Sequence, residues 1–298
     1  MLQHQQSQLG VSPQSTLVRG IFERPAQSFS FDPRVIRWIL DDPANPLNRI
    51  AQLIPQGAII LDIGAGNGIL PRLLQALDKS VEIDAVEPDP VAREVATPCY
   101  RTIFPGGLEA YLTSCPRDVR YDFIVLADVI EHLANPEPIL RSLKSLLSPG
   151  GSVVVSTPNV AFASVRLALL NGCFDYVDSG ILERTHLRFY TLKTLQHLFA
   201  STDLYPAAQF HCLRHPLAME IVLDDFPLAP WILARIARDE LSRVYQFLFV
   251  LRFEPCEIMV RENLGTGGRG LPIAYVIHWT RRAVGKFFRQ VWAPREKR

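Results

Sequence analysis

The hydrophobic pattern changes character along the chain. Residues 1–30 carry Gln, Ser and Pro without periodicity, which predicts a mobile N-terminal tail. Order begins near Asp32-Pro33, where an Asp cap precedes a proline at a first helical position. Apolar residues at helical spacing over residues 35–40 predict a first helix, and residues 46–54 predict a second. Beyond Gly57, short apolar runs alternate with amphipathic segments, as in an α/β protein.

The short apolar runs predict strands that are buried on both faces. They lie at residues 58–63, 83–86, 100–104, 123–127 and 152–156, with two later candidates at residues 207–213 and 246–253. Helix-like segments separate the early runs, at residues 69–77, 90–96 and 138–147. Strands that are apolar throughout and alternate with helices are typical of a parallel sheet with helices on both faces. The pattern therefore predicts one α/β domain over about residues 31–255.

The strongest chemical signal follows the first predicted strand. Residues 61–70 run Leu-Asp-Ile-Gly-Ala-Gly-Asn-Gly-Ile-Leu, so an apolar strand passes through three alternating glycines into a helix. Glycine permits positive φ and lets a ligand approach the backbone, at the edge where open α/β sheets bind ligands. The second predicted strand ends in Glu87, 23 residues after Gly64. A carboxylate there can accept both hydroxyls of an adenosine ribose.

The spacing of the glycines distinguishes between adenosine cofactors. A dinucleotide loop has glycine at its first, third and sixth positions, but the sixth position counted from Gly64 is Ile69, and a glycine falls early, at Gly68. Asp62 adds an acceptor at the base of the loop, which suits an ammonium group better than a diphosphate. The loop therefore favours S-adenosyl-L-methionine over NAD.

These segments resemble the motifs of class I S-adenosylmethionine-dependent methyltransferases, in the same order along the chain. The similar segments are residues 62–68, 86–89, 121–133 and 146–155, and residues 172–191 further resemble a bacterial branch akin to ubiquinone-pathway O-methyltransferases. The resemblance implies a Rossmann-like seven-stranded sheet, mostly parallel with an antiparallel last strand. It also implies cofactor-binding roles for Asp62, Gly64, Ala65, Gly66, Glu87 and Asp128.

Methyl transfer is an in-line displacement, so the protein mainly aligns the acceptor and removes its proton. A neutral imidazole is a suitable base for a hydroxyl acceptor, and His132 and His186 are the candidates. A resemblance to small-RNA 2′-O-methyltransferases and ubiquinone-pathway enzymes adds a divalent metal held by Glu131, His132 and His186. The structural alternatives are a helix-start Glu-His pair beside the cofactor and, for His186, a hydrogen bond within a lid.

The segment at about residues 159–191 is long for a connection after the fifth strand, which is typical of a cap over a binding site. Its residues Arg184, Arg188 and Tyr190 are the candidates for substrate binding. The two arginines can bind a phosphate or carboxylate of the acceptor. Alternatively they pair with acids of the same segment, namely Asp175, Asp178 or Glu183.

Composition and charge limit the classes of protein and the cellular locations that fit this sequence. The 298 residues are 48% hydrophobic and carry a net charge of +1, which excludes extensive disorder and gives no field that would attract nucleic acid. No secretory signal or membrane-spanning run is expected, and five scattered cysteines indicate a reduced cytoplasmic protein. Residues 256–298 predict a linker and a basic amphipathic C-terminal helix. That helix can lie on an anionic membrane surface, here the inner membrane, or dock on its own domain or on a partner.

The sequence thus predicts a cytoplasmic S-adenosylmethionine-dependent methyltransferase. The expected acceptor is an oxygen of a small molecule, a lipid-linked intermediate or a glycan. One alternative is a non-catalytic cofactor-binding subunit with a regulatory or assembly role. Another is an NAD-dependent oxidoreductase, which the glycine spacing disfavours.

Overall fold

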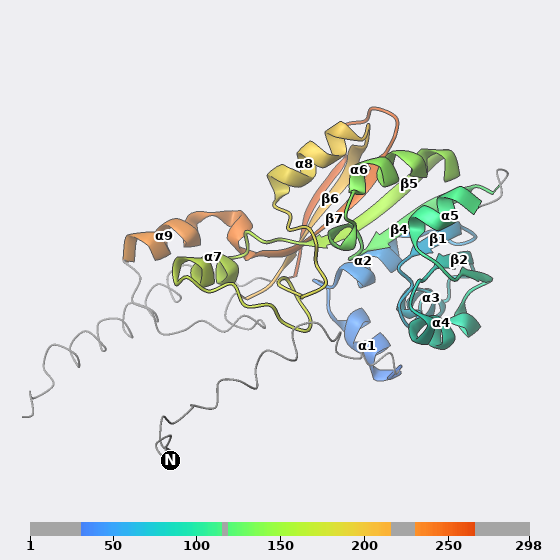
Figure 1. Cartoon of the computed structure of the whole chain (residues 1–298), viewed down its shortest axis with the longest axis horizontal. Helices are drawn as coiled ribbons and strands as arrows, with labels where there is room; N and C mark the ends of the chain where they lie inside the picture. Colours follow the sequence, from blue (N-terminus) through green and yellow to red (C-terminus); the bar gives the residue numbers. More distant parts are fainter. Residues whose placement is uncertain (1–30, 115–118, 216–229, 266–298) are drawn as a thin grey trace, which may run out of the picture.

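One mixed sheet runs through the domain in the computed structural model, which describes residues 31–114, 119–215 and 230–265 (Figure 1). The strand order is β3-β2-β1-β4-β5-β7-β6-β8. The first five strands are parallel, β7 runs antiparallel between β5 and β6, and β8 is parallel to β6. The strands are β1 (Ile59–Ile63), β2 (Glu82–Val86), β3 (Thr102–Phe104), β4 (Tyr121–Ala127), β5 (Leu147–Pro158), β6 (Tyr205–Leu213), β7 (Val244–Arg252) and β8 (Val260–Leu264).

The Rossmann-like, mostly parallel sheet with an antiparallel β7 confirms the predicted fold class, but the strand count of seven is wrong. The eighth strand, β8, pairs with β6 along the sheet edge. It lies in the stretch predicted to begin the linker, so the sheet extends past residue 255. The sequence pattern could not reveal it, because residues 260–263 are exposed and only Leu264 is buried. An exposed edge strand lacks the apolar run that marks the other strands.

Helices cover both faces of the sheet, as predicted. Leu61 and Ile63 of β1 point into the core beneath α5 (Leu108–Ser114), α6 (Pro136–Ser142) and α8 (Leu192–Ser201). Ile60 points to the other face, beneath α1 (Arg34–Asp41), α2 (Pro46–Leu53) and α3 (Ile69–Ala76). The helix α4 (Pro90–Ala96) lies beside α3. The described part of the chain also forms the short 3₁₀ helices η1 (Thr97–Cys99), η2 (Ile130–His132), η3 (Leu143–Leu146) and η5 (Glu240–Arg243).

The predicted cap segment has a small core of its own. After β5 the chain forms α7 (Ala163–Leu170) and then an irregular stretch up to α8. The buried residues that form this small core are Phe162, Val165, Ile181 and Leu182. An ion pair of 2.6 Å joins Arg166 of α7 to Asp239, which follows α9 (Pro230–Arg238). Packing therefore holds this segment as a folded unit above the end of β5.

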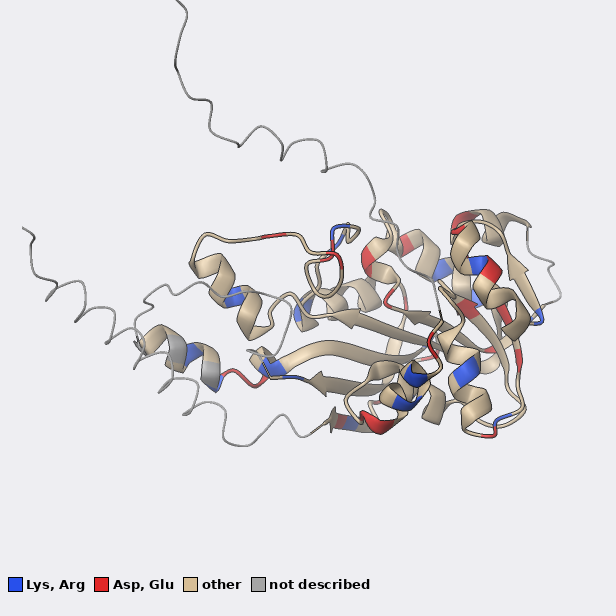
Figure 2. Cartoon of the chain, turned by 90° about the horizontal axis from the view of Figure 1, so that it is seen from below, with Lys and Arg blue, Asp and Glu red and all other residues tan. Residues whose placement is uncertain are grey.

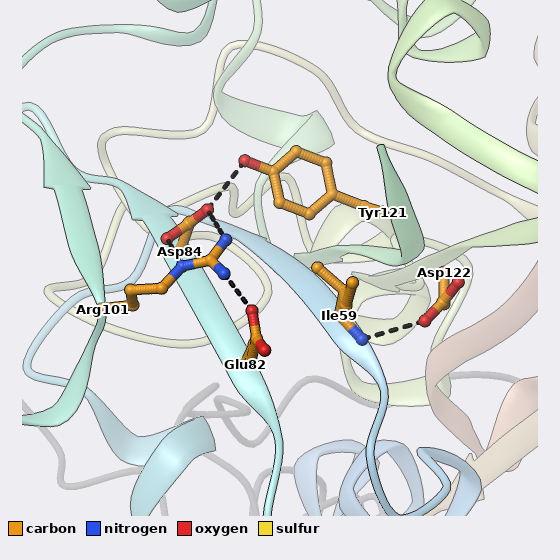
Figure 3. A network of polar contacts seen from close by, with 6 residues as sticks. All are labelled: Ile59, Glu82, Asp84, Arg101, Tyr121 and Asp122. Carbon is orange, nitrogen blue, oxygen red and sulfur yellow. Dashed lines mark hydrogen bonds and ion pairs between the residues drawn. The ribbon is translucent and has the colours of Figure 1, made fainter. Parts of the chain in front are cut away.

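A polar network ties the strands together at the ends remote from the glycine loop (Figure 3). The Arg101 guanidinium donates to Asp84 at 2.7 Å and also bonds Glu82, and the Tyr121 hydroxyl donates to Asp84 at 3.1 Å. The Ile59 backbone N–H donates to Asp122 at 3.0 Å. These contacts join β1, β2 and β4 to the residue preceding β3, so they stabilise the register that places the strand ends at the site.

The predicted N-terminal tail and C-terminal helix lie outside the described residues. Among those that the structure describes, no helix combines the length and apolar character needed to cross a membrane. Basic and acidic residues are interspersed over the elements seen in Figure 2, in keeping with the small net charge.

Candidate active site

The glycine loop connects β1 to α3 with three residues in the left-handed region. Gly64, Gly66 and Gly68 have φ of +74°, +53° and +77°. A Cβ on Gly64 would lie 2.8 Å from Cγ2 of Val129, so the loop packs against the turn that follows β4. A Cβ on Gly66 would meet nothing within 4 Å. Gly64 is therefore needed for close packing, while the backbone at Gly66 is open to a ligand.

An arginine that the sequence analysis missed braces this loop. The Arg72 guanidinium donates to the carbonyl oxygens of Gly68 at 2.8 Å and Val95 at 3.2 Å, and it also bonds the Asn67 carbonyl. It thereby links the loop to α4 and satisfies carbonyls at the turn. A basic residue one helical turn after a glycine loop is the sequence signal that could have indicated it.

Glu87, at the end of β2, lies directly against the loop. Its two carboxylate oxygens accept the backbone N–H groups of Gly66 at 2.7 Å and Asp89 at 2.8 Å. Burial raises the pKa of Glu87, an effect that these two hydrogen bonds oppose. The structure thus brings together Gly66 and Glu87, the two features on which the cofactor prediction depended.

Asp62 is buried at the base of the loop. The Tyr100 hydroxyl donates to one of its oxygens at 2.5 Å. Burial raises the pKa of Asp62 to about 7 despite this hydrogen bond. Ala65 is also buried, and its backbone N–H and that of Gly64 both donate to the Val86 carbonyl. The sequence analysis missed Tyr100, which lies 38 residues from Asp62.

Asp128 follows β4 with φ of +55°. Its carboxylate accepts the Ser156 hydroxyl at 2.8 Å, and the Gln246 amide donates to both of its oxygens at 2.9 Å. Burial raises the pKa of Asp128, and these hydrogen bonds oppose that rise. Since Val129 contacts the glycine loop, Asp128 is held next to it. Ser156 and Gln246 are polar residues at the ends of predicted apolar strands, and that position is the signal that could have found them.

Glu131 and His132 of the turn after β4 lie together with His186 of the cap segment. One possible ligand atom from each residue lies within 4.8 Å of the others. Glu131, in η2, is buried, and its Oε2 accepts the Thr157 hydroxyl at 3.0 Å. Its Oε1 is buried without a hydrogen-bond partner. Burial raises the pKa of Glu131 well above its usual value, and the nearby Asp128 raises it further.

Both imidazoles of this group are anchored through Nδ1. His186 Nδ1 lies 3.0 Å from the Ile181 carbonyl oxygen, and His132 Nδ1 lies 3.2 Å from that of Thr185. A carbonyl oxygen only accepts, so Nδ1 carries a proton in each ring, and in the neutral form of the ring the lone pair lies on Nε2. The ring centroids are 4.8 Å apart. Burial lowers the pKa of His186, which favours the neutral ring.

The three residues predicted to bind substrate have partners within the protein. Arg184 forms an ion pair of 2.6 Å with Asp178, one of the acids considered from the sequence. Arg188 donates through Nε to the Ala134 carbonyl at 3.2 Å. Tyr190 is buried, and its hydroxyl donates to the Ile130 carbonyl at 3.4 Å. The contacts of Arg188 and Tyr190 join the cap to the turn around η2, whereas that of Arg184 lies within the cap. A direct contact of these residues with an acceptor stays a prediction.

Comparison with known proteins places this geometry in a family. A family model described as a methyltransferase domain matches residues 36–209. The chain belongs to this methyltransferase family. The methyltransferase is 27% identical over 164 residues to the ubiquinone biosynthesis O-methyltransferase of Xanthomonas axonopodis pv. citri, covering 50% of this chain and 66% of that protein. The enzyme of the same name from Dinoroseobacter shibae is 30% identical, with 58% of this chain and 71% of that protein covered.

A solved S-adenosylmethionine-dependent methyltransferase from Archaeoglobus fulgidus is 17% identical, with 70% of this chain and 91% of that chain covered and a TM-score of 0.49. The predicted methyltransferase class and its cofactor, S-adenosylmethionine, are confirmed by the family match. The oxidoreductase alternative has no support among these relatives.

The residues of the methyltransferase fit this cofactor and also a divalent cation. The open backbone at Gly66 and the adjacent Glu87 carboxylate provide space and acceptors for the adenosine portion. Glu131, whose Oε1 has no partner, and the two imidazoles each offer one ligand atom within 4.8 Å of the others, which makes a carboxylate and imidazole donor set. Such a set suits Mn²⁺ or Zn²⁺, and Mg²⁺ with additional oxygen ligands.

Replacing Gly66 tests whether the open loop holds the cofactor. We expect Gly66→Val to weaken S-adenosylhomocysteine binding by at least about tenfold in calorimetry, because the side chain fills the space above the backbone. The matched control is Gly57→Val, since Gly57 also has positive φ and open surroundings but precedes β1. Equal weakening in both variants would show that backbone strain alone causes the loss.

The raised pKa of Asp62 predicts how the free energy of unfolding changes with pH. The folded protein holds this proton up to about pH 7, whereas the unfolded chain releases it near its usual value of 3.8. The folded state therefore binds more protons between these values, and the group's contribution to stability declines as pH rises through this window, by up to about 4 kcal/mol. We expect Asp62→Asn to flatten that decline in urea unfolding from pH 4 to 7. An unchanged slope would contradict the assignment.

Proposed function

We propose that this chain transfers the methyl group of S-adenosylmethionine to an oxygen of a small molecule, a lipid-linked intermediate or a glycan. The observation that carries the proposal is the pair of imidazoles, His132 and His186, each with Nδ1 against a backbone carbonyl, so that Nε2 carries the lone pair of the neutral ring. His132 belongs to the turn after β4, whose Val129 contacts the glycine loop, and His186 lies beside His132. We call this part of the site the acceptor side. The names of the relatives, which are O-methyltransferases, support an oxygen acceptor.

The proposed reaction makes two bonds, carbon–oxygen and nitrogen–hydrogen, and breaks two, carbon–sulfur and oxygen–hydrogen. The acceptor oxygen attacks the methyl carbon, the carbon–sulfur bond breaks, and the cofactor leaves as its uncharged thioether. The hydroxyl proton goes to Nε2 of an imidazole, which becomes an imidazolium and later returns the proton to water. His186 suits this role because burial lowers its pKa and keeps the base neutral before the reaction.

The buried carboxylates serve the cofactor in this proposal. Glu87 accepts the ribose hydroxyls, and Asp62 and Asp128 lie toward the methionine end. Because Gln246 donates to both oxygens of Asp128, that carboxylate is fixed before the cofactor binds. A fixed carboxylate beside a sulfonium and an ammonium group contributes to alignment without reorganisation during the reaction.

Glu131 offers a second arrangement for the acceptor side. Its buried, unpartnered oxygen supports a divalent cation held by Glu131, His132 and His186. When bound, such an ion would lower the pKa of a hydroxyl and orient it. The protein's own contribution is the anchoring of both imidazoles by cap carbonyls, which would present Nε2 to a metal in the same way as to a proton.

The setting of the reaction is proposed from the sequence. We propose a reduced cytoplasmic location. The segment at residues 275–298 has seven Lys and Arg and one Glu, and this basic character supports peripheral contact with an anionic membrane. Such contact would suit a lipid-linked acceptor. The net charge of +1 argues against nucleic acid as the acceptor.

Labelled S-adenosylmethionine tests the activity. We expect transfer of label to a base-stable product when the protein is incubated with a cell extract. His186→Ala should retain cofactor binding and lower turnover by about 10²-fold or more, because it removes the base, whereas the exposed His197→Ala should not. Binding of the cofactor without any labelled product would support the non-catalytic subunit instead.

A chelator distinguishes the two acceptor arrangements. If Glu131, His132 and His186 hold a metal, chelation should suppress transfer and added Mn²⁺ or Mg²⁺ should restore it. Glu131→Gln should then weaken metal binding measured by calorimetry. Full activity in the chelator, with no metal found by elemental analysis, would rule out the metal arrangement and support a mechanism with the imidazole base only.

A further inference from the structure

The cap loop that carries His186 also contacts His132 through a side chain. Thr185 Oγ1 lies 3.2 Å from His132 Nδ1, and the same hydroxyl donates to Glu183 Oε1 at 2.5 Å. Neither Glu183 nor Thr185 was predicted from the sequence to act in the site. Glu183 appeared there only as an optional partner for an arginine, and the structure pairs Arg184 with Asp178 instead.

The direction of these hydrogen bonds follows from the chemistry of the groups. A threonine hydroxyl has one proton, and an ionised carboxylate can only accept. Because the Thr185 proton is directed to Glu183, its oxygen faces His132 Nδ1 as an acceptor. The Thr185 carbonyl, 3.2 Å from the same nitrogen, is also an acceptor. Both contacts require the proton of a neutral His132 to be on Nδ1.

We propose that Glu183 and Thr185 are positioning residues that hold His132 in the Nδ1-protonated tautomer and present its Nε2 lone pair to the acceptor side. The Glu183 carboxylate fixes the direction in which the Thr185 hydroxyl donates. This hydroxyl and the Thr185 backbone carbonyl then fix the tautomer of the His132 imidazole. This inference rests on the proposed function, because a lone pair on Nε2 matters only if the imidazole receives a proton or binds a cation there.

The backbone around Glu183 is fixed well enough for this role. Its N–H donates to the Gly180 carbonyl at 3.2 Å, and its carbonyl accepts the His186 N–H at 3.0 Å. The adjacent Ile181 and Leu182 are buried in the small core of the cap. One short loop therefore supplies the Ile181 carbonyl to His186 and the Thr185 contacts to His132.

Without the carboxylate, the hydroxyl proton of Thr185 can rotate toward Nδ1 and favour the opposite tautomer, in which Nε2 carries the proton. An amide at position 183 can also donate to the hydroxyl, with the same effect. The arrangement follows the general rule that the partner of one ring nitrogen sets the state of the other.

The tautomer can be measured directly. We would label histidine with ¹⁵N in the full chain and record long-range ¹H–¹⁵N spectra at about pH 8.5, where free imidazole is neutral, with His132→Gln identifying the signal. We expect the wild-type His132 to show a protonated Nδ1 and an unprotonated Nε2. Glu183→Gln and Thr185→Val should shift the population toward protonated Nε2, and Thr185→Ser should restore it.

Kinetic measurements add a second test, because a purely structural role would not lower kcat while leaving KM unchanged. We expect Glu183→Gln and Thr185→Val to lower kcat by about tenfold with the KM for S-adenosylmethionine unchanged, and Thr185→Ser to recover most of it. Thr113→Val makes the same chemical change in α5 and should alter neither readout. A wild-type His132 with its proton on Nε2, or variants with an unchanged tautomer, would overturn the inference. Absence of methyl transfer in the wild type would instead overturn the proposed function, since the spectra require no acceptor.

Discussion

The close packing of the glycine loop on the turn after β4 is the constraint on which the site depends. With no side chain on Gly64, Val129 approaches to a distance that a Cβ would not permit. This contact brings the loop, the proposed cofactor site, next to Asp128 and the η2 turn, where we propose that the acceptor binds. In-line methyl transfer tolerates little error in distance or angle, so in this proposal the packing of Val129 on Gly64 contributes to the alignment of donor and acceptor.

The carboxyl groups around this contact are held by donors from distant elements. Glu87 accepts two backbone N–H groups, Asp62 accepts the Tyr100 hydroxyl, and Asp128 accepts Gln246 and Ser156. Burial disfavours the charged form of each, and the hydrogen bonds oppose that effect. A cationic cofactor would add a further favourable interaction with the ionised forms.

The fold was predictable because its signals are local. Each apolar run between residues 58 and 253 became a strand, since a buried strand must be apolar along its length. The strand β8 escaped because its residues 260–263 are exposed. The loop and Glu87 were likewise found from their spacing alone.

The partners of the functional groups were not predictable in the same way. Gln246 lies 118 residues from Asp128, and Thr185 lies 53 residues from His132. Gln246 reaches Asp128 only because β7 inserts antiparallel beside β5, pairing Gln246 with Pro158. That register is a property of the whole sheet, and no motif near Asp128 encodes it. The same reasoning explains why Tyr100 was counted only as part of a strand.

The two halves of the proposed site, for cofactor and for acceptor, are built on different supports, and this division has a consequence for specificity. The cofactor half is made from strand ends and is fixed by the central sheet. The acceptor half depends on a cap with its own small core, whose carbonyls and side chains orient both imidazoles. Substitutions in that core can therefore move the acceptor side relative to the methyl group while leaving the cofactor contacts in place. A cap that sets the tautomer of a histidine also ties chemistry to its own folding, because an opened cap would leave His132 without the partners that direct its lone pair.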